Sequence, residues 1–317
     1  MTAVLPRPVT DMNVDALSEQ MTLLFILIFI AYIASKAGLL PKNANKVIAD
    51  LVVNITNPAT ILYAVATSSH ALSNTAVLGI LGITILTLGG QMILAHGFTK
   101  ALRIQPRPAG VYRFMLVFSN CGFLGYPVVR ALFGSDAVFV ASMYNLIFQI
   151  LCFTYGVRQV AGNPKDQSFS PKMFCTPMVI ISVLALILYL TNVSFPPMVV
   201  ETLSLLDRIT SPASMLVIGC VLASYPLKTI FGRWHVYVFC VVRLIVIPVL
   251  VWAILRLFLT DSLILGVMVV LSALPGATNT VLLCSKYGGD ESTAASGLFF
   301  STLLSLVTLP VLLRILI

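Results

Sequence analysis

The residues best suited to chemistry in this chain stand in two stretches rich in glycine and proline, each inside an apolar run. The first reads FSNCGFLGYP at 118–127, and the second reads SALPGATNTV at 272–281. Both place asparagine, glycine and proline where a membrane-spanning helix should be most regular, so both predict an interrupted helix. A helix that restarts within a membrane offers free N–H groups and the positive end of its dipole, which favour an anion. The two stretches therefore predict an anion-binding site.

Asparagines beside the interruptions are the leading candidate ligands for such an anion. Asn120 and Asn279 could each hydrogen-bond a substrate or cap a half-helix, and both roles could hold together. Asn57 precedes Pro58, whose kink would bring it to a cavity or only shape the helix bundle. The predicted substrate-binding residues are Asn57, Ser119, Asn120, Gly122, Arg208, Pro275, Thr278 and Asn279.

Three ionisable residues are expected deep inside apolar runs, where charges are costly and usually functional. Asp207 and Arg208 lie about ten residues into a run, which is roughly 14 Å deep at 1.5 Å per residue. Arg208 could attract an anionic substrate, and Asp207 could carry a coupling proton or bind a cation. An internal ion pair would explain Asp207 and Arg208 equally well, and so would an error of several residues in the predicted start of the span. Arg243 stays protonated, so we expect it to support or couple the interrupted helices rather than to contact substrate.

The elements that position these residues must be membrane-spanning helices. Of the 317 residues, 59% are hydrophobic and 9% are charged, against roughly 25% charged in an average soluble domain. The mean hydropathy is +1.01. The sequence predicts ten spans, each long enough to cross a hydrocarbon core of about 30 Å: 20–39, 45–67, 74–98, 109–133, 136–158, 174–193, 198–222, 235–258, 262–286 and 291–315.

Several function classes are excluded by the same composition. The 6 cysteines are scattered without a CxxC or Cys/His cluster, so neither disulfides nor a metal site is expected. No nucleophile–base pair is evident, so we expect neither an enzyme nor a cofactor. The N-terminus has acidic residues in place of the basic region of a cleavable signal peptide.

The distribution of lysine and arginine predicts the orientation in the membrane. One set of alternate loops carries 13 of the 19 basic residues and the other set carries 4, with Arg208 and Arg243 inside spans. The positive-inside rule then places both termini outside the cytoplasm. The net charge of +8 therefore reflects short basic loops rather than a nucleic-acid surface.

An internal repeat links the two interruptions. The segment 51–67 resembles 205–221 at an offset of 154 residues, and the same offset pairs Gly122 with Gly276. Two halves of five spans each enter the membrane with opposite polarity, because five is odd, and inverted repeats are typical of secondary transporters. Glycines at one interruption would be explained equally well by close helix packing. Two interruptions in register favour a binding site instead.

The chain also resembles the auxin efflux carrier (PIN-like) family over nearly its whole length. The residues that carry the resemblance are Asn57-Pro58-Ala59, NCGFLGYP at 120–127, Arg243 with Pro248, and KYGGDESTAASGLFFSTLLSLVTLP at 286–310. The resemblance implies an all-α membrane protein in which two broken helices cross, as in sodium/proton antiporters and bile-acid symporters. It also implies scaffold helices in 1–67 and 174–222, and a mobile transport domain in 74–158 and 235–315.

The same resemblance implies a substrate class and a setting. The family moves organic anions, such as auxin or dicarboxylates like malate and malonate, and a homodimer through the scaffold is plausible. The short central loop resembles bacterial members, which implies the bacterial inner membrane. By position, Asn120 and Gly122 match the family's substrate-contacting break and Arg243 matches a basic position. The acidic residue of the family's third span is absent, since that span holds only Gln91.

We therefore expect a secondary carrier of small mono- or dicarboxylates that works by elevator-type alternating access. The coupling ion, proton or sodium, stays open. One alternative is a sodium-coupled symporter of bile-acid type. Another is a membrane receptor that binds a ligand without moving it.

Overall fold

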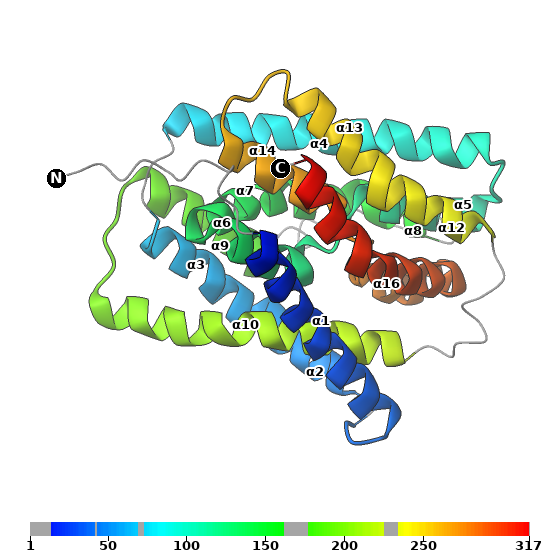
Figure 1. Ribbon diagram of the computed structural model, residues 1–317, viewed down its shortest axis with the longest axis horizontal. Coiled ribbons are helices and arrows are strands. Elements are labelled where there is room, and N and C mark those ends of the chain that lie inside the picture. The colour runs from blue at the N-terminus through cyan, green and yellow to red at the C-terminus, as the bar shows by residue number, and fades with distance from the viewer. Residues whose placement is uncertain (1–13, 42, 69–72, 162–176, 225–233, 317) are drawn as a thin grey trace.

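The computed structural model describes residues 14–41, 43–68, 73–161, 177–224 and 234–316, and these residues form an all-α protein (Figure 1). Residues 1–13, 162–176 and 225–233, which carry part of the basic charge used to predict orientation, lie outside the described residues. The α-helices are α1 (Val14–Lys36), α2 (Ala44–Leu51), α3 (Asn57–Ala66), α4 (Asn74–Ala101), α5 (Pro106–Val117), α6 (Tyr126–Phe133), α7 (Ser135–Leu151), α8 (Val157–Val160), α9 (Pro177–Leu190), α10 (Pro197–Ala223), α12 (Trp234–Val241), α13 (Ile247–Leu255), α14 (Ser262–Ala273), α15 (Asn279–Tyr287) and α16 (Glu291–Leu316).

The expected all-α membrane protein is confirmed. Within the described residues, 6 helical segments are long and apolar enough to cross a membrane: Ala44–Ala66, Thr75–Ala101, Ser135–Val160, Pro197–Ala223, Trp234–Leu255 and Glu291–Leu316. The shorter apolar helices are Thr22–Lys36, Cys121–Phe133, Pro177–Leu190 and Ser262–Ala273. Each of these segments falls within or close to one of the predicted spans.

Wide π-helical turns interrupt several of the long helices. They are η2 (Val52–Thr56), η3 (Cys121–Gly125), η4 (Cys152–Gly156) and η7 (Val242–Val246). Proline lacks an N–H group and its ring would clash with the carbonyl four residues earlier, so a wider turn accommodates it. Three of the turns are followed within two residues by a proline, namely Pro58, Pro127 and Pro248. Pro212, by contrast, lies inside the continuous helix α10.

The helices pack in two groups. In the first group, α10 lies against α1, α2 and α3, and α9 packs on α3. In the second group, α4 contacts α5 and α7, α12 contacts α16, and α13 contacts α14. Figure 1 shows α1, α2 and α10 along one side of the molecule and α4 and α13 along the opposite side. Helix α7 also contacts α3 and α9 of the first group, so the two groups share an extensive interface. The division into scaffold and transport helices stays a prediction.

Helices α1 and α10 approach closely at Gly219. A Cβ atom at this position would overlap the backbone carbonyl of Ile28 and the Cβ of Ala31. Small residues of this kind let membrane helices pack backbone to backbone. The first group of helices therefore depends on the missing side chain at Gly219.

We expect Gly219→Ala to lower the free energy of unfolding by about 1–3 kcal/mol, because the added methyl group overpacks the α1–α10 contact. Thermal unfolding of the purified protein in detergent measures the effect. Gly89→Ala in α4 is the matched control, since a Cβ there would meet no atom within 4 Å. Equal unfolding temperatures for the two variants would contradict the assignment.

Candidate functional site

Two interrupted helices cross in the middle of the second group. Helix α5 ends at Val117 and α14 ends at Ala273, and the chain then runs extended for a few residues before a new helix begins. The extended segments pair antiparallel at Ser119 and Gly276. The N–H of Asn120 donates to Pro275 O at 2.9 Å, and the N–H of Ala277 donates to Phe118 O at 3.0 Å. Backbone N–H and C=O groups that have no helical partner in one extended segment thereby find hydrogen-bond partners in the other segment.

Arg243 lies behind the crossing and closes the carboxyl ends of both half-helices. Its Nε donates to Leu274 O at 3.0 Å, and its Nη1 donates to Leu116 O at 2.8 Å. The side chain is fully buried, and it forms no ion pair with the acidic residues that the structure describes. A cation is favoured at helix C-termini, where the dipole is negative. Arg243 therefore stabilises the crossing and leaves a positive charge beside it.

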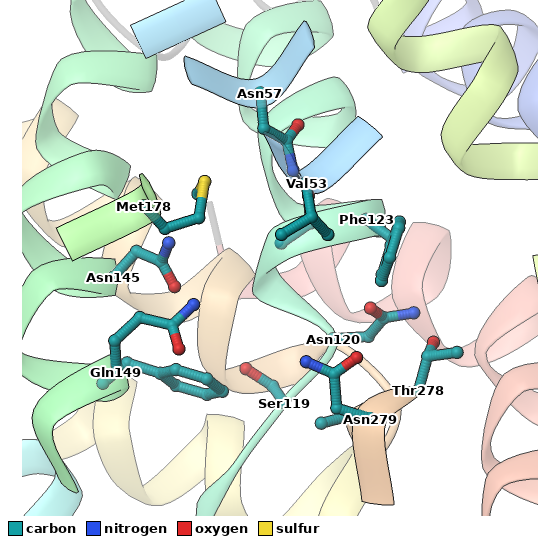
Figure 2. Close-up of a pocket in the computed structure, with 13 residues that line it drawn as sticks. Val53, Asn57, Ser119, Asn120, Phe123, Asn145, Gln149, Met178, Thr278 and Asn279 are labelled. Carbon is teal, nitrogen blue, oxygen red and sulfur yellow. Dashed lines mark hydrogen bonds between the residues drawn. The ribbon is translucent and has the colours of Figure 1, made fainter. Parts of the chain in front are cut away.

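A small cavity lies beside the crossing, with a volume of about 50 Å³ (Figure 2). Six of the predicted substrate-binding residues line it: Asn57, Ser119, Asn120, Gly122, Thr278 and Asn279. Figure 2 shows Asn120, Thr278 and Asn279 close together, with Asn57 approaching from another helix. The other lining residues are Val53, Phe123, Asn145, Phe148, Gln149, Met178 and Ala277. No charged side chain is among these described lining residues, so polar contacts in the cavity come from amides, hydroxyls and backbone.

The amino ends of the two restarting helices are open. Among the described residues, no side chain caps η3, which follows Asn120, or α15, which follows Thr278. The capping role weighed for Asn120 is not adopted by its side chain; its backbone carbonyl accepts hydrogen bonds from Leu124 and Gly125 instead. The free N–H groups at these ends retain the positive dipole that favours an anion.

Buried polar atoms around the cavity lack partners. Asn57 Oδ1, Asn120 Nδ2 and Thr278 Oγ1 accept or donate no hydrogen bond among the described residues. Leaving such an atom unsatisfied costs about 1–3 kcal/mol. The amide nitrogen of Asn57 is satisfied, because it donates to Gly122 O at 3.1 Å. The cavity is thus built from polar groups that a bound molecule or water can satisfy.

Among the cavity residues that the sequence analysis missed, two have polar side chains, Asn145 and Gln149 of α7. The Oδ1 of Asn145 accepts from Cys121 Sγ at 3.3 Å, and its Nδ2 donates to Tyr126 Oη at 2.9 Å. Asn145 therefore ties the interruption to α7. The available signal was two amide side chains four residues apart on one face of an apolar helix.

Four of the predicted residues do not line the cavity, namely Arg243, described above, and Asp207, Arg208 and Pro275. Asp207 is buried, and its carboxylate pairs with Arg130 rather than with its neighbour. The internal ion pair weighed as one explanation for Asp207 is therefore present. Arg208 is exposed on the other face of α10 and does not line the cavity. Pro275 contributes its carbonyl to the crossing but does not line the cavity either. In the described part of the chain, no group of three or more His, Cys, Asp or Glu residues could hold a metal ion.

Comparison with known proteins adds independent information. The sequence model of the membrane transport protein family (Mem_trans) matches residues 16–172 and 165–313, so it finds two segments that together cover nearly the whole chain. An uncharacterized transporter of Methanocaldococcus jannaschii is 27% identical over 90% of this chain and 94% of its own length. An uncharacterized transporter of Methanothermobacter thermautotrophicus is 23% identical over 92% of this chain and 96% of its own length.

We expect Arg243→Met to lower the free energy of unfolding by about 3 kcal/mol or more, because two hydrogen bonds from a charged group are lost and two buried carbonyls are left unsatisfied. Thermal unfolding in detergent measures the change. The matched control is Arg256→Met, since Arg256 is exposed and lies over the Trp252 ring at 5.0 Å from its centroid. An Arg243→Met protein as stable as the control would refute the supporting role.

Proposed function

The chain belongs to the membrane transport protein family, which is the auxin efflux carrier family, and from that premise we propose that it is a secondary carrier of small organic anions. It is a multi-pass membrane transporter and not an enzyme. The observation that carries the proposal is a pair of helix amino ends that no described side chain caps. They meet at one cavity beside Arg243, a cation with no ion-pair partner among the described residues.

The charge around the cavity favours an anion. Arg243 contributes a positive charge within the protein, and the two restarting helices direct their positive dipole ends to the same place. No carboxylate lines the cavity among the described residues, so nothing there would balance a bound cation. A carboxylate substrate would accept hydrogen bonds from Asn120 Nδ2, from the hydroxyl of Thr278 and from the amide of Asn279.

The size of the cavity favours a small substrate. A volume of about 50 Å³ is large enough for a carboxylate group, whereas sites for drug-sized ligands have volumes of about 300–1,000 Å³. The substrate class that we propose, a mono- or dicarboxylate of malonate or malate size, rests on the family, and the cavity would hold one of its carboxylate groups. A bile-acid-sized anion fits this cavity less well.

Alternating access is the mechanism that we propose for this carrier. The match of the family model in two segments supports an inverted repeat of five plus five spans, and the pairing of Ser119 with Gly276 joins one interruption from each half. The proposed transport domain, 74–158 and 235–315, carries the crossing. It would move against the scaffold helices of 1–67 and 174–222 as in an elevator.

The side of the membrane to which the cavity opens is inferred from the positions of its lining residues along their helices. Val53, Gln149 and Met178 lie in the halves of their helices that lead to the basic loops. With the orientation predicted from loop charge, both termini are outside the cytoplasm and the cavity faces the cytoplasm. We place the protein in the bacterial inner membrane, as a homodimer through the scaffold.

We expect Asn120→Ala and Asn279→Ala each to weaken binding of the transported carboxylate about tenfold or more, because a hydrogen bond to a charged group is lost. Counterflow of radiolabelled malonate and malate in proteoliposomes, together with equilibrium binding, measures the loss. Asn43→Ala is the control, since Asn43 is exposed and its side chain caps no helix. Wild-type flux in both site variants, with unfolding temperatures unchanged, would exclude this site.

We expect the flux to be unchanged when sodium is replaced by potassium at a fixed membrane potential, because the described cavity contains no carboxylate to bind a cation. Uptake into proteoliposomes with and without sodium measures this directly. Uptake that requires sodium would favour the sodium-coupled symporter. Binding of malonate or malate without any flux would favour the receptor.

A further inference from the structure

An ion pair connects the crossing to the first group of helices. Arg130 lies on α6, the helix that continues directly from η3 and the interruption, and it donates to the carboxylate of Asp207 on α10. The side chain of Asp207 is 8% exposed and that of Arg130 is 24% exposed. The guanidinium also lies over the ring of Tyr63 on α3, with 5.6 Å between Cζ and the ring centroid. Helix α6 packs on α7 of the second group, so its arginine links that group to two helices of the first.

This contact lies on the opposite side of the crossing from the cavity. The cavity reaches Gln149 and Met178, near helix ends that lead to the basic loops. Arg130 and Tyr63 lie instead near the carboxyl ends of α6 and α3, which lead to the other set of loops. Asp207 is in the first half of α10, which starts from those same loops. The crossing therefore separates an accessible face from a face closed by Arg130, Asp207 and Tyr63.

In the proposed repeat, Asp207 is the counterpart of Val53, which lies 154 residues earlier. Val53 lines the cavity. In an inverted repeat, the counterpart of a residue that lines the access path on one side lies on the access path of the other side. Asp207 is thus located where the second access path would open.

Arg130 and Asp207 are joined by a single hydrogen bond, which leaves other donors and acceptors of the two side chains unused. Arg130 Nε and Nη2 and Asp207 Oδ1 have no partner among the described residues. A bidentate arginine–carboxylate pair would be stronger and more rigid. A single contact at a partly exposed arginine is easier to break, because water can hydrate the guanidinium as it leaves.

We propose that Arg130, Asp207 and Tyr63 form a gate that closes the far side of the crossing in this conformation and separates when the site turns to that side. The gate rests on the proposed alternating access, since it has a function only if the crossing moves against α3 and α10. Its opening exposes the buried face of α10 beneath Asp207, and its closure holds α6 on the scaffold helices.

A buried serine supplies a reporter for gate opening that needs no substrate. Ser214 lies two turns beyond Asp207 on α10, is fully buried, and has no partner for its hydroxyl. We expect Arg130→Gln and Asp207→Asn each to raise the rate of maleimide labelling of Ser214→Cys about tenfold in nanodiscs without added carboxylate. The double variant should label no faster than either single variant, because all three lose the same contact. Each rate is corrected with the protein that lacks Ser214→Cys.

Matched variants separate a gate from a general loss of packing. Ser182→Cys on α9 is a second buried serine without a partner, and its labelling rate should not change with the gate variants. Arg314→Gln, at an exposed arginine, and Arg130→Lys, which keeps the positive charge, should leave Ser214→Cys near the parent rate.

Unchanged labelling of Ser214→Cys in both gate variants would overturn the gate, and so would an equal rise at Ser182→Cys. Because the labelling uses no substrate, a failure of malonate and malate flux would count against the proposed function and not against the gate.

Discussion

A backbone group that loses its helical partner inside a membrane must find another partner, and the rest of this site depends on how that constraint is met. At the carboxyl ends of the interrupted helices, the carbonyls of Leu116 and Leu274 accept hydrogen bonds from Arg243. In the extended segments, the two chains satisfy one another. The amino ends of the restarting helices are treated differently, since no side chain caps them. The protein therefore closes the negative ends of the crossing and leaves its positive ends open.

This arrangement has an electrostatic consequence. Arg243 is fully buried and has no acidic partner among the residues that the structure describes. Such a charge is costly, and hydrogen bonds to carbonyls offset only part of the cost. An anion bound at the open amino ends would supply the missing charge without adding a carboxylate to the protein. If the proposed anion binds there, its affinity and the stability of the crossing would depend on the same cation, although Arg243 does not line the cavity.

The sequence predicted the spans and both interruptions because long apolar runs and misplaced glycine, proline and asparagine are local signals. It did not predict the orientation of side chains around regular helices. Asp207 and Arg208 are adjacent, yet one is buried and the other exposed, because successive residues point about 100° apart around a helix. The partner of Asp207 is Arg130, which is 77 residues away. Asn145 escaped notice because it lies within the regular helix α7, away from any proline or glycine.

Each half of the proposed repeat contains an interrupted helix, but the side chains at corresponding positions of the two interruptions differ. At the repeat offset of 154 residues, the counterpart of Asn120 is Leu274 and that of Asn279 is Gly125. The two asparagines are therefore not equivalents, yet both line one cavity on one side of the crossing. A symmetric pair of sites would offer a substrate the same ligands on each face. A single asymmetric site cannot do so, and under the proposed alternating access it would have to be carried from one face to the other. The asymmetry thus argues for movement of the whole crossing against the scaffold helices rather than for alternate opening around two fixed sites.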